Sequence, residues 1–495
     1  MLEGLFRVKP VEASPHVDAG EPVEGSLTGE SDLKRVLTAR HLLLLGVGAI
    51  IGAGIFVMTG QAAANHAGPA IMLSFVLAGV ACAFAGLCYA EFSAMIPVSG
   101  SAYSYTYATL GEAVAWFVGW SLVLEYLFAA SAVAVGWSAY TISLMETIAH
   151  YLGSDWKFPA LLESAPVTYA NGNFTLTGSL FNLPAVLIVS AVGVLCYIGI
   201  RQSATANAVI VTIKVGVILA LIGFGSQYVN PDNWTPFIPP NEGGDRFGWP
   251  GVFRAASIVF FAYIGFDAVS TTAQEAKNPQ RDMPIGILGS LAVCTVLYII
   301  VAAVLTGMMP YNLLGTAKPV ATALENYPAL SWLKLAVEIG AVAGLTSVIL
   351  VMLMGQPRVF FAMARDGLMP KFFGAAHPKY HTPHKATVVV AVVAALLAAF
   401  FPLGILGDLV SMGTLLAFAT VCTGVLILRR TRPDLPRPFR VPFAPVTCVL
   451  GTLSCLALVG FMGWYNWALL GAWTFVGFLI YFGYGYRHSK LRQAP

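Results

Sequence analysis

Glycines interrupt two long apolar stretches at points where a membrane helix would otherwise run unbroken. Residues 46–54 read Gly-Val-Gly-Ala-Ile-Ile-Gly-Ala-Gly, and residues 260–267 read Phe-Phe-Ala-Tyr-Ile-Gly-Phe-Asp. Hydrocarbon cannot satisfy free backbone groups, so an unwound stretch at bilayer depth is stable only where protein, water or a ligand supplies hydrogen bonds. Breaks at matching positions of two half-chains are typical of the substrate site of a secondary transporter.

Three ionisable side chains lie within apolar stretches, where an uncompensated charge is costly. Lys214 therefore needs either a backbone carbonyl as its partner or a role in transport. Asp267 follows the second break and either caps the helix after it or carries a proton. Glu125 has three open roles: it recognises a substrate side chain, relays protons, or pairs with a buried donor such as Tyr126 or Trp120.

The elements that position these residues are membrane helices. Hydrophobic residues make up 57% of the 495 and charged residues 10%, a composition that excludes a soluble globular domain. Runs of about 20 apolar residues can span the bilayer. The sequence predicts twelve of them, with 111–148 as one tilted helix: 41–64, 70–96, 111–148, 182–200, 204–228, 250–273, 284–309, 332–363, 385–402, 408–428, 445–463 and 465–486.

The distribution of charge predicts how these helices are oriented. Most of the 27 Lys and Arg fall in alternate loops, above all 358–385 and 429–440, which places both termini in the cytoplasm. The net charge of +3 therefore reflects orientation and not nucleic-acid binding. We expect five regions, namely a cytoplasmic tail (1–40), helices one to five (41–228), helices six to ten (250–428), helices eleven and twelve (445–486) and a second cytoplasmic tail (487–495).

The two breaks fall in the first and sixth predicted helices, which divides the chain into two groups of five with two helices appended. An odd number of spans per repeat inverts the second copy across the membrane, so both broken helices should face each other near the midplane. The predicted fold is thus an all-α membrane protein of twelve helices, with a 5+5 inverted repeat and two extra C-terminal helices.

Five segments of this sequence resemble the amino acid, polyamine and organocation superfamily. They are 48–56, Gly68-Pro69, 97–103, 260–270, and the stretch 275–286, which reads Glu-Ala-Lys-Asn-Pro-Gln-Arg-Asp-Met-Pro-Ile-Gly. The resemblance covers residues 33–488 and is strongest to the cationic amino acid transporter subfamily and its bacterial relatives. It implies a LeuT-like fold and amino acid transport by alternating access.

The resemblance also implies a substrate site at the two breaks. Half-helix N-termini favour anions, and unwound carbonyls accept hydrogen bonds from cations. The substrate carboxylate would bind backbone N–H groups around Gly52, Ala53 and Gly54. The substrate amine would bind the carbonyl groups of Ile50, Phe261, Ala262 and Ile264, with the Phe261 ring as an aromatic gate. Relatives commonly have Ser or Thr where this chain has Ala53, so a hydroxyl contact is lost here.

By the same resemblance, Lys214 occupies the place of a metal ion in the sodium-coupled relatives. This implies coupling to protons, because a desolvated Lys titrates near physiological pH, with Asp267 and Glu125 as further candidates. Met352 would face the side-chain pocket and shorten it, which favours small neutral amino acids such as Ala, Gly or Val. The negative charge of Glu125 instead favours Arg or Lys as the substrate. We give more weight to the limited volume of the side-chain pocket.

Other features have structural interpretations. The glycines alternatively permit close helix packing only, and Met352 alternatively packs against neighbouring helices. All seven cysteines lie in apolar spans, where thiols behave as small hydrophobes. The loop with His377, His381 and His384 is basic and interrupted by prolines, so we expect no metal site and no cofactor. Glu91 and Glu338 lie near the ends of predicted helices, where we expect them at the interface and outside the site.

We therefore expect a permease that imports small neutral L-amino acids with protons, in a plasma membrane of the bacterial inner-membrane type. A cationic amino acid transporter, an exchanger, a channel and a non-transporting amino acid sensor remain as alternatives. A major-facilitator carrier would divide six and six, and its usual basic residues are missing from 97–110. An enzyme would need clustered His, a nucleophile with a base, or a metal motif. The expected partners are the amino acid, protons and the lipid bilayer, and the sequence does not specify an accessory subunit.

Overall fold

The computed structural model describes residues 7–9, 37–96, 101–170, 173–199, 204–380 and 382–493. Most of the predicted N-terminal tail, the first four residues of the motif at 97–103, His381 and the last two residues of the chain lie outside the described residues.

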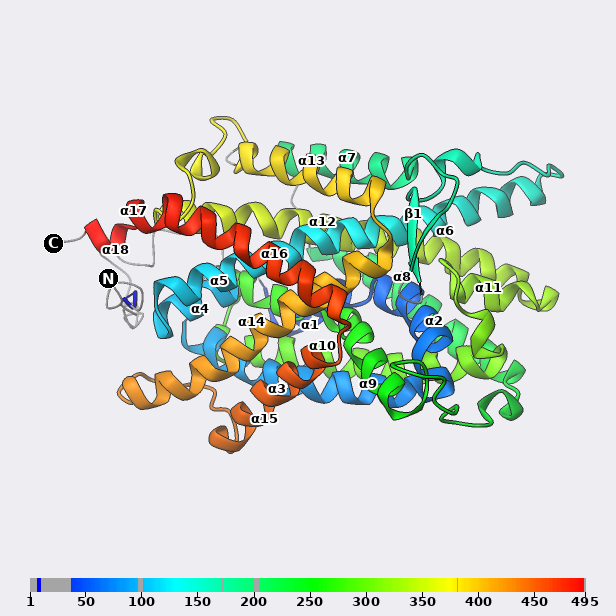
Figure 1. The fold of residues 1–495 in the computed structure, drawn as a ribbon, viewed down its shortest axis with the longest axis horizontal. Helices are drawn as coiled ribbons and strands as arrows, with labels where there is room; N and C mark the ends of the chain where they lie inside the picture. The colour runs from blue at the N-terminus through cyan, green and yellow to red at the C-terminus, as the bar shows by residue number, and fades with distance from the viewer. Residues whose placement is uncertain are drawn as a thin grey trace.

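The described chain is almost entirely helical (Figure 1). One small antiparallel hairpin pairs β1 (Val167–Ala170) with β2 (Asn173–Leu176), with Val167 opposite Leu176. The α-helices are α1 (Ala39–Ile50), α2 (Thr59–Ala62), α3 (Ile71–Met95), α4 (Ser101–Thr109), α5 (Glu112–Val123), α6 (Ala129–Tyr151), α7 (Leu183–Ile198), α8 (Ala204–Gly225), α9 (Gly248–Val259), α10 (Pro279–Met308), α11 (Pro319–Glu325), α12 (Ser331–Arg365), α13 (His384–Phe400), α14 (Leu403–Thr431), α15 (Ala444–Gly460), α16 (Trp464–Ile480), α17 (Tyr486–His488) and α18 (Lys490–Gln493).

Eight helical segments of the described residues are long and apolar enough to cross a membrane. Three shorter apolar helices accompany them, namely α7, α13 and α15. The eight are Ala39–Met95, Glu112–Tyr151, Asn207–Tyr228, Gly248–Ala273, Pro279–Met308, Pro328–Arg365, Leu403–Thr431 and Trp464–His488. The chain is thus a helical, multi-pass membrane protein, while twelve crossings and the inverted repeat stay predictions.

Two of these segments can be compared with the predicted boundaries between the first three helices. Ala39–Met95 contains the first two predicted helices, and the chain turns between them at Gly68, whose φ of +59° favours glycine. Glu112–Tyr151 is one continuous segment of 40 residues, in which the π-helical turn η4 (Leu124–Phe128) joins α5 to α6. A π-turn inside a long helix is frequently found at a functional site, and this one contains Glu125.

The broken first helix lies inside the bundle. α1 packs against α10 and α8, α3 packs against α10, and α12 packs against α6 (Figure 1). α14 packs against α15 and also contacts α3. The described N-terminal residues lie close to the C-terminal helices, because the Arg7 guanidinium donates a 3.0 Å hydrogen bond to the carbonyl oxygen of Leu491.

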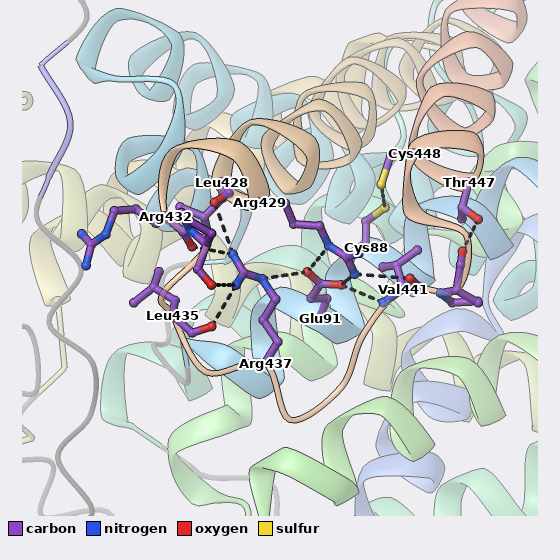
Figure 2. Close-up of polar contacts among 12 residues, drawn as sticks. Cys88, Glu91, Leu428, Arg429, Arg432, Leu435, Arg437, Val441, Thr447 and Cys448 are labelled. Carbon is purple, nitrogen blue, oxygen red and sulfur yellow. Dashed lines mark hydrogen bonds and ion pairs between the residues drawn. The ribbon is translucent and has the colours of Figure 1, made fainter.

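Glu91 is buried, contrary to the interfacial position expected from the sequence (Figure 2). Its carboxylate accepts hydrogen bonds from Arg429, including one of 3.0 Å from Nε, and a 2.7 Å hydrogen bond from the Val441 N–H. Arg437 Nε lies 3.6 Å from the same carboxylate. An acid near a helix end usually stays hydrated, but here the loop between α14 and α15 covers the end of α3 and replaces the water.

Glu338 is also buried, contrary to the interfacial position expected from the sequence. Its side chain is fully buried on α12, where it accepts hydrogen bonds from the hydroxyls of Ser143 at 2.5 Å and Thr147 at 3.2 Å. Lys334 Nζ lies 3.8 Å from the same carboxylate. The partners on α6 come from a distant part of the sequence, so the position of Glu338 within its own helix did not predict its burial.

We expect Glu91→Ala to lower the stability of the protein. The substitution leaves Arg429 and the buried Val441 N–H without their acceptor, and breaking a mostly buried ion pair costs on the order of 3 kcal/mol of unfolding free energy. The measurement is the apparent melting temperature of the detergent-purified protein. Asp434→Ala, which removes the exposed pair of Asp434 with Arg432, is the control and should leave that temperature unchanged. Equal melting temperatures for the two variants would contradict the expectation.

Candidate functional site

The first helix is broken at Ile51 and Gly52. α1 ends at Ile50, and Ile51 has an extended backbone with φ −71° and ψ 100°. Helical structure resumes after Gly52 and continues through the π-helical turn η1 (Gly54–Met58) into α2. The break therefore frees backbone groups among the predicted site residues Ile50, Gly52, Ala53 and Gly54, all of which are buried.

The sixth predicted helix is broken at Ile264 and Gly265. α9 continues through the 3₁₀ turn η8 (Phe260–Tyr263), Ile264 is extended with ψ 132°, and a second 3₁₀ segment, η9, covers Asp267–Glu275. Gly265 has φ +121°, a conformation that side chains with a Cβ rarely adopt. The predicted residues Phe261, Ala262 and Ile264 lie at this break and are buried.

The backbones of the two breaks are in direct contact. A Cβ atom placed on Gly54 would lie 2.2 Å from Cα of Ala262, and one placed on Gly265 would lie 2.9 Å from the carbonyl carbon of Ala49. Glycine is thus required at both positions by close approach. These glycines therefore do permit close packing, and the segments that pack together are the two breaks themselves.

Lys214 contacts the first break. Its side chain is fully buried, and Nζ donates hydrogen bonds to the carbonyl oxygens of Gly48 at 2.8 Å and Ile51 at 2.9 Å. The ammonium thus compensates two carbonyls near the end of α1, which is the first of the two alternatives that the sequence left open for Lys214. Among the described residues, no hydrogen bond or ion pair joins Lys214 to Glu125 or Asp267.

Asp267 lies at the second break and is fully buried. One carboxylate oxygen accepts a 2.9 Å hydrogen bond from the Tyr126 hydroxyl, and the other accepts one of 3.3 Å from the N–H of Gly265. The carboxylate therefore compensates a backbone N–H inside the break itself. Tyr126 on η4 is the residue that connects this break to the continuous helix formed by α5 and α6.

Glu125 is fully buried beside this group. Neither carboxylate oxygen has a hydrogen-bond partner of ordinary geometry in the part of the chain that the structure describes. The carboxyl of Asp267 and the hydroxyl of Thr414 are near enough to interact with it. The two donors named from sequence are used elsewhere, because Tyr126 donates to Asp267 and Trp120 donates to the carbonyl of Trp473 at 2.8 Å.

The structure adds two residues that the sequence did not single out. The Tyr298 hydroxyl on α10 lies 2.8 Å from the carbonyl oxygen of Ile50 and 3.0 Å from that of Ala262. Val348 on α12 lies 3.3 Å from the position that a Cβ on Gly52 would occupy. Buried Met352 lies four residues after Val348, and residues at this spacing share a helix face. A lone Tyr or Val in an apolar helix carries no sequence signal for such contacts.

The arrangement can compensate both charges of a zwitterion. Unwound carbonyls at both breaks accept hydrogen bonds from Lys214 or Tyr298, and the unwound N–H of Gly265 donates to Asp267. Two broken helices in contact inside a helical membrane fold are typical of a secondary transporter.

Comparison with known proteins agrees with that class. The family model described as amino acid permease matches residues 37–484, which is most of the chain. The chain belongs to the amino acid permease family, within the superfamily that its motifs resemble, and it is a membrane transporter and not an enzyme.

Three relatives illustrate the range of the family. The branched-chain amino acid permease BcaP of Bacillus subtilis (strain 168) is 47% identical over 94% of this chain and 96% of its own length. The methylthioribose transporter of the same organism is 45% identical over 99% of this chain and 100% of its own. The vacuolar cationic amino acid transporter 2 of Arabidopsis thaliana is 38% identical over 88% of this chain and 67% of its own. The cationic transporter is thus a more distant relative than the two Bacillus proteins.

We expect Gly54→Ala to abolish transport. Its Cβ would meet the backbone of Ala262 at 2.2 Å, a contact that only a shift of one break against the other can relieve. The measurement is uptake by the purified, reconstituted protein. The matched control is Gly223→Ala on α8, where a Cβ meets no atom within 4 Å and where helix propensity favours Ala. Normal uptake by Gly54→Ala would show that the breaks are not held in this contact during transport.

Proposed function

We propose that this permease carries neutral amino acids inward across the membrane by alternating access and that protons drive it. The observation that carries the proposal is the contact between two unwound segments, one compensated by the Lys214 ammonium and the other by the Asp267 carboxylate. Backbone groups of both signs, released by the two breaks, meet there, which suits a ligand that carries both an ammonium and a carboxylate.

The proposed binding residues follow from this geometry. The substrate carboxylate binds N–H groups at Gly52, Ala53 and Gly54, where helical structure resumes after the first break. The substrate amine binds carbonyls that both breaks direct to a common point, as the Tyr298 contact indicates for Ile50 and Ala262. Phe261 and Ile264 complete this proposed amine site, and the Phe261 ring covers it.

Proton coupling is proposed through Lys214, with Asp267 and Glu125 as the acidic partners. Lys214 supplies a positive charge at the carbonyls of the first break, and loss of its proton removes that charge and weakens the contact. Glu125 and Asp267 are both fully buried and lie close together, so two negative charges there would repel each other strongly. A proton shared by these two carboxyl groups relieves the repulsion, which makes the pair a candidate carrier.

Size selects the substrate in this proposal. Buried Met352 lies on the face of α12 that also presents Val348 to the first break, and its bulk is proposed to limit the substrate to a short aliphatic side chain. The name of the Bacillus subtilis relative BcaP, a branched-chain amino acid permease, supports neutral aliphatic substrates and extends the small set to Val, Leu and Ile. The more distant cationic transporters and the buried Glu125 support the alternative of Arg and Lys.

A second candidate substrate comes from the methylthioribose transporter, which is 45% identical over almost the whole chain. A thiosugar carries neither an ammonium nor a carboxylate, so the charge pair at the two breaks would have no counterpart in it. An amino acid exchanger and a non-transporting sensor would both retain the proposed site.

The proposed topology has twelve crossings, a 5+5 inverted repeat and two further helices. In this proposed topology both termini lie in the cytoplasm, by the positive-inside rule, and the membrane is a bacterial inner membrane. The contact between Arg7 and Leu491 supports a common side for the two ends. No feature described above specifies an accessory subunit.

The test is uptake of labelled valine and arginine into proteoliposomes under an inward proton gradient, a sodium gradient, or internal amino acid alone. We expect proton-driven accumulation of valine, competed by unlabelled valine and not by methylthioribose. Uptake that requires sodium would overturn the proposed coupling, and arginine preference would overturn the size argument. Uptake only with internal amino acid would identify an exchanger, and binding without uptake a sensor.

We expect Lys214→Ala to lose proton-driven accumulation. The substitution removes two hydrogen bonds to Gly48 and Ile51 and leaves these carbonyls uncompensated in a buried site. Downhill exchange of valine is the companion measurement, because it separates loss of coupling from loss of the site. Lys371→Ala, an exposed residue of the loop after α12, is the control. Accumulation by Lys214→Ala as in the wild type would leave Asp267 and Glu125 as the proton carriers.

We expect Met352→Ala to widen the range of substrates. Removing most of a buried Met opens space beside the first break, so leucine and larger side chains should compete with labelled valine more strongly than they do in the wild type. The measurement is a competition series with alanine, valine, leucine and phenylalanine. An unchanged order of competition would place Met352 in helix packing alone.

A further inference from the structure

The Tyr298 hydroxyl touches both broken helices at once. Tyr298 lies on the continuous helix α10 and is fully buried. Its oxygen is 2.8 Å from the carbonyl oxygen of Ile50, the last residue of α1, and 3.0 Å from that of Ala262 in η8. These two carbonyls belong to the proposed amine site, and each comes from a different break.

One hydroxyl controls the spacing of two acceptors. Because both carbonyl oxygens lie within hydrogen-bond distance of the same oxygen, they are held within about 6 Å of each other. An ammonium nitrogen that donates to both carbonyls at ordinary distances needs the same spacing. Each carbonyl oxygen has two lone pairs and can accept from Tyr298 and from a ligand together.

The hydroxyl also leaves acceptor capacity at the site. A phenol has a single proton and can donate fully to only one of the two carbonyls at a time. The two carbonyls together therefore receive one strong hydrogen bond from Tyr298, although both are buried. An ammonium group has three N–H donors and could donate a hydrogen bond to both carbonyls at once.

We propose that Tyr298 is a positioning residue for the substrate amine, which fixes the carbonyls of Ile50 and Ala262 at the spacing that an ammonium spans. This inference rests on the proposed amino acid site at the breaks. Preorganised acceptors favour binding because their ordering is complete before the ligand arrives. The residue thereby makes the site selective for an amine over a group that cannot donate to two carbonyls.

Tyr263 provides a matched control in the same aromatic cluster. The rings of Tyr263 and Tyr298 are 5.6 Å apart, and both pack against Phe75. The Tyr263 hydroxyl also donates to a backbone carbonyl, that of Phe75 at 2.7 Å, but Phe75 lies in the unbroken helix α3. Both Tyr→Phe substitutions therefore remove one buried hydroxyl, and only that of Tyr298 frees the carbonyls of the breaks.

The experiment compares wild type, Tyr298→Phe and Tyr263→Phe in proteoliposomes. It measures KM and kcat for labelled alanine and inhibition by lactate, in which a hydroxyl replaces the amine of alanine. We expect Tyr298→Phe to raise the KM for alanine about threefold to tenfold, the effect of one neutral hydrogen bond, and to narrow the preference for alanine over lactate. Tyr263→Phe should keep that preference, whatever its effect on stability.

The outcomes separate this inference from the proposed function. Wild-type protein that neither transports nor binds alanine or valine refutes the proposed function itself. Wild-type transport with an unchanged alanine preference in Tyr298→Phe, or an equal change in both variants, overturns the role of Tyr298. Replacing Tyr298 with 4-aminophenylalanine restores a donor, which can now reach both carbonyls, and should return the KM toward the wild-type value. That variant also decides the matter if Tyr298→Phe does not fold, because a raised KM in it overturns the inference.

Discussion

The structure depends on one constraint, which is that backbone groups released by a broken helix must find partners inside the membrane. The partners come from continuous helices next to the breaks. Lys214 on α8 reaches the carbonyls of Gly48 and Ile51, and Tyr298 on α10 reaches those of Ile50 and Ala262. Tyr140 on α6 donates a 2.7 Å hydrogen bond to the carbonyl of Phe56. The unbroken helices thus supply the hydrogen bonds that stabilise two unwound segments next to each other.

The two breaks receive opposite charges. The first break exposes carbonyls and is met by an ammonium, while the second exposes the Gly265 N–H and is met by the Asp267 carboxylate. This follows from the direction of the chain, since the end of a helix presents carbonyls and its beginning presents N–H groups. In the proposed site, a zwitterion bound between the breaks would meet acceptors and donors that the protein's own charges already complement in part.

Sequence predicted the parts of this arrangement that are local. The glycine clusters mark both breaks, and the cost of burying an isolated ammonium predicted that Lys214 has either a backbone carbonyl partner or a role in transport. Tyr298 and Val348 could not be predicted, because their roles depend on which helices become neighbours. The predicted interfacial positions of Glu91 and Glu338 were wrong for the same reason. The sequence does not show which loop or second helix covers the end of a helix. Two relatives align over 94% and 99% of this chain, but the assignment of each site residue stays a prediction.

Structural support and proton coupling by Lys214 are compatible on geometric grounds. An ammonium has three N–H donors, and Lys214 uses two of them for the carbonyls of Gly48 and Ile51. A neutral amine still has two N–H donors, so it can keep both contacts while it loses its charge. Deprotonation therefore changes the strength of the attraction more than the number of hydrogen bonds, because charged donors bind roughly twice as strongly as neutral ones. In the proposed mechanism, a tether that weakens without breaking lets the end of α1 move while its carbonyls stay paired, which is what a proton-driven change of access would require.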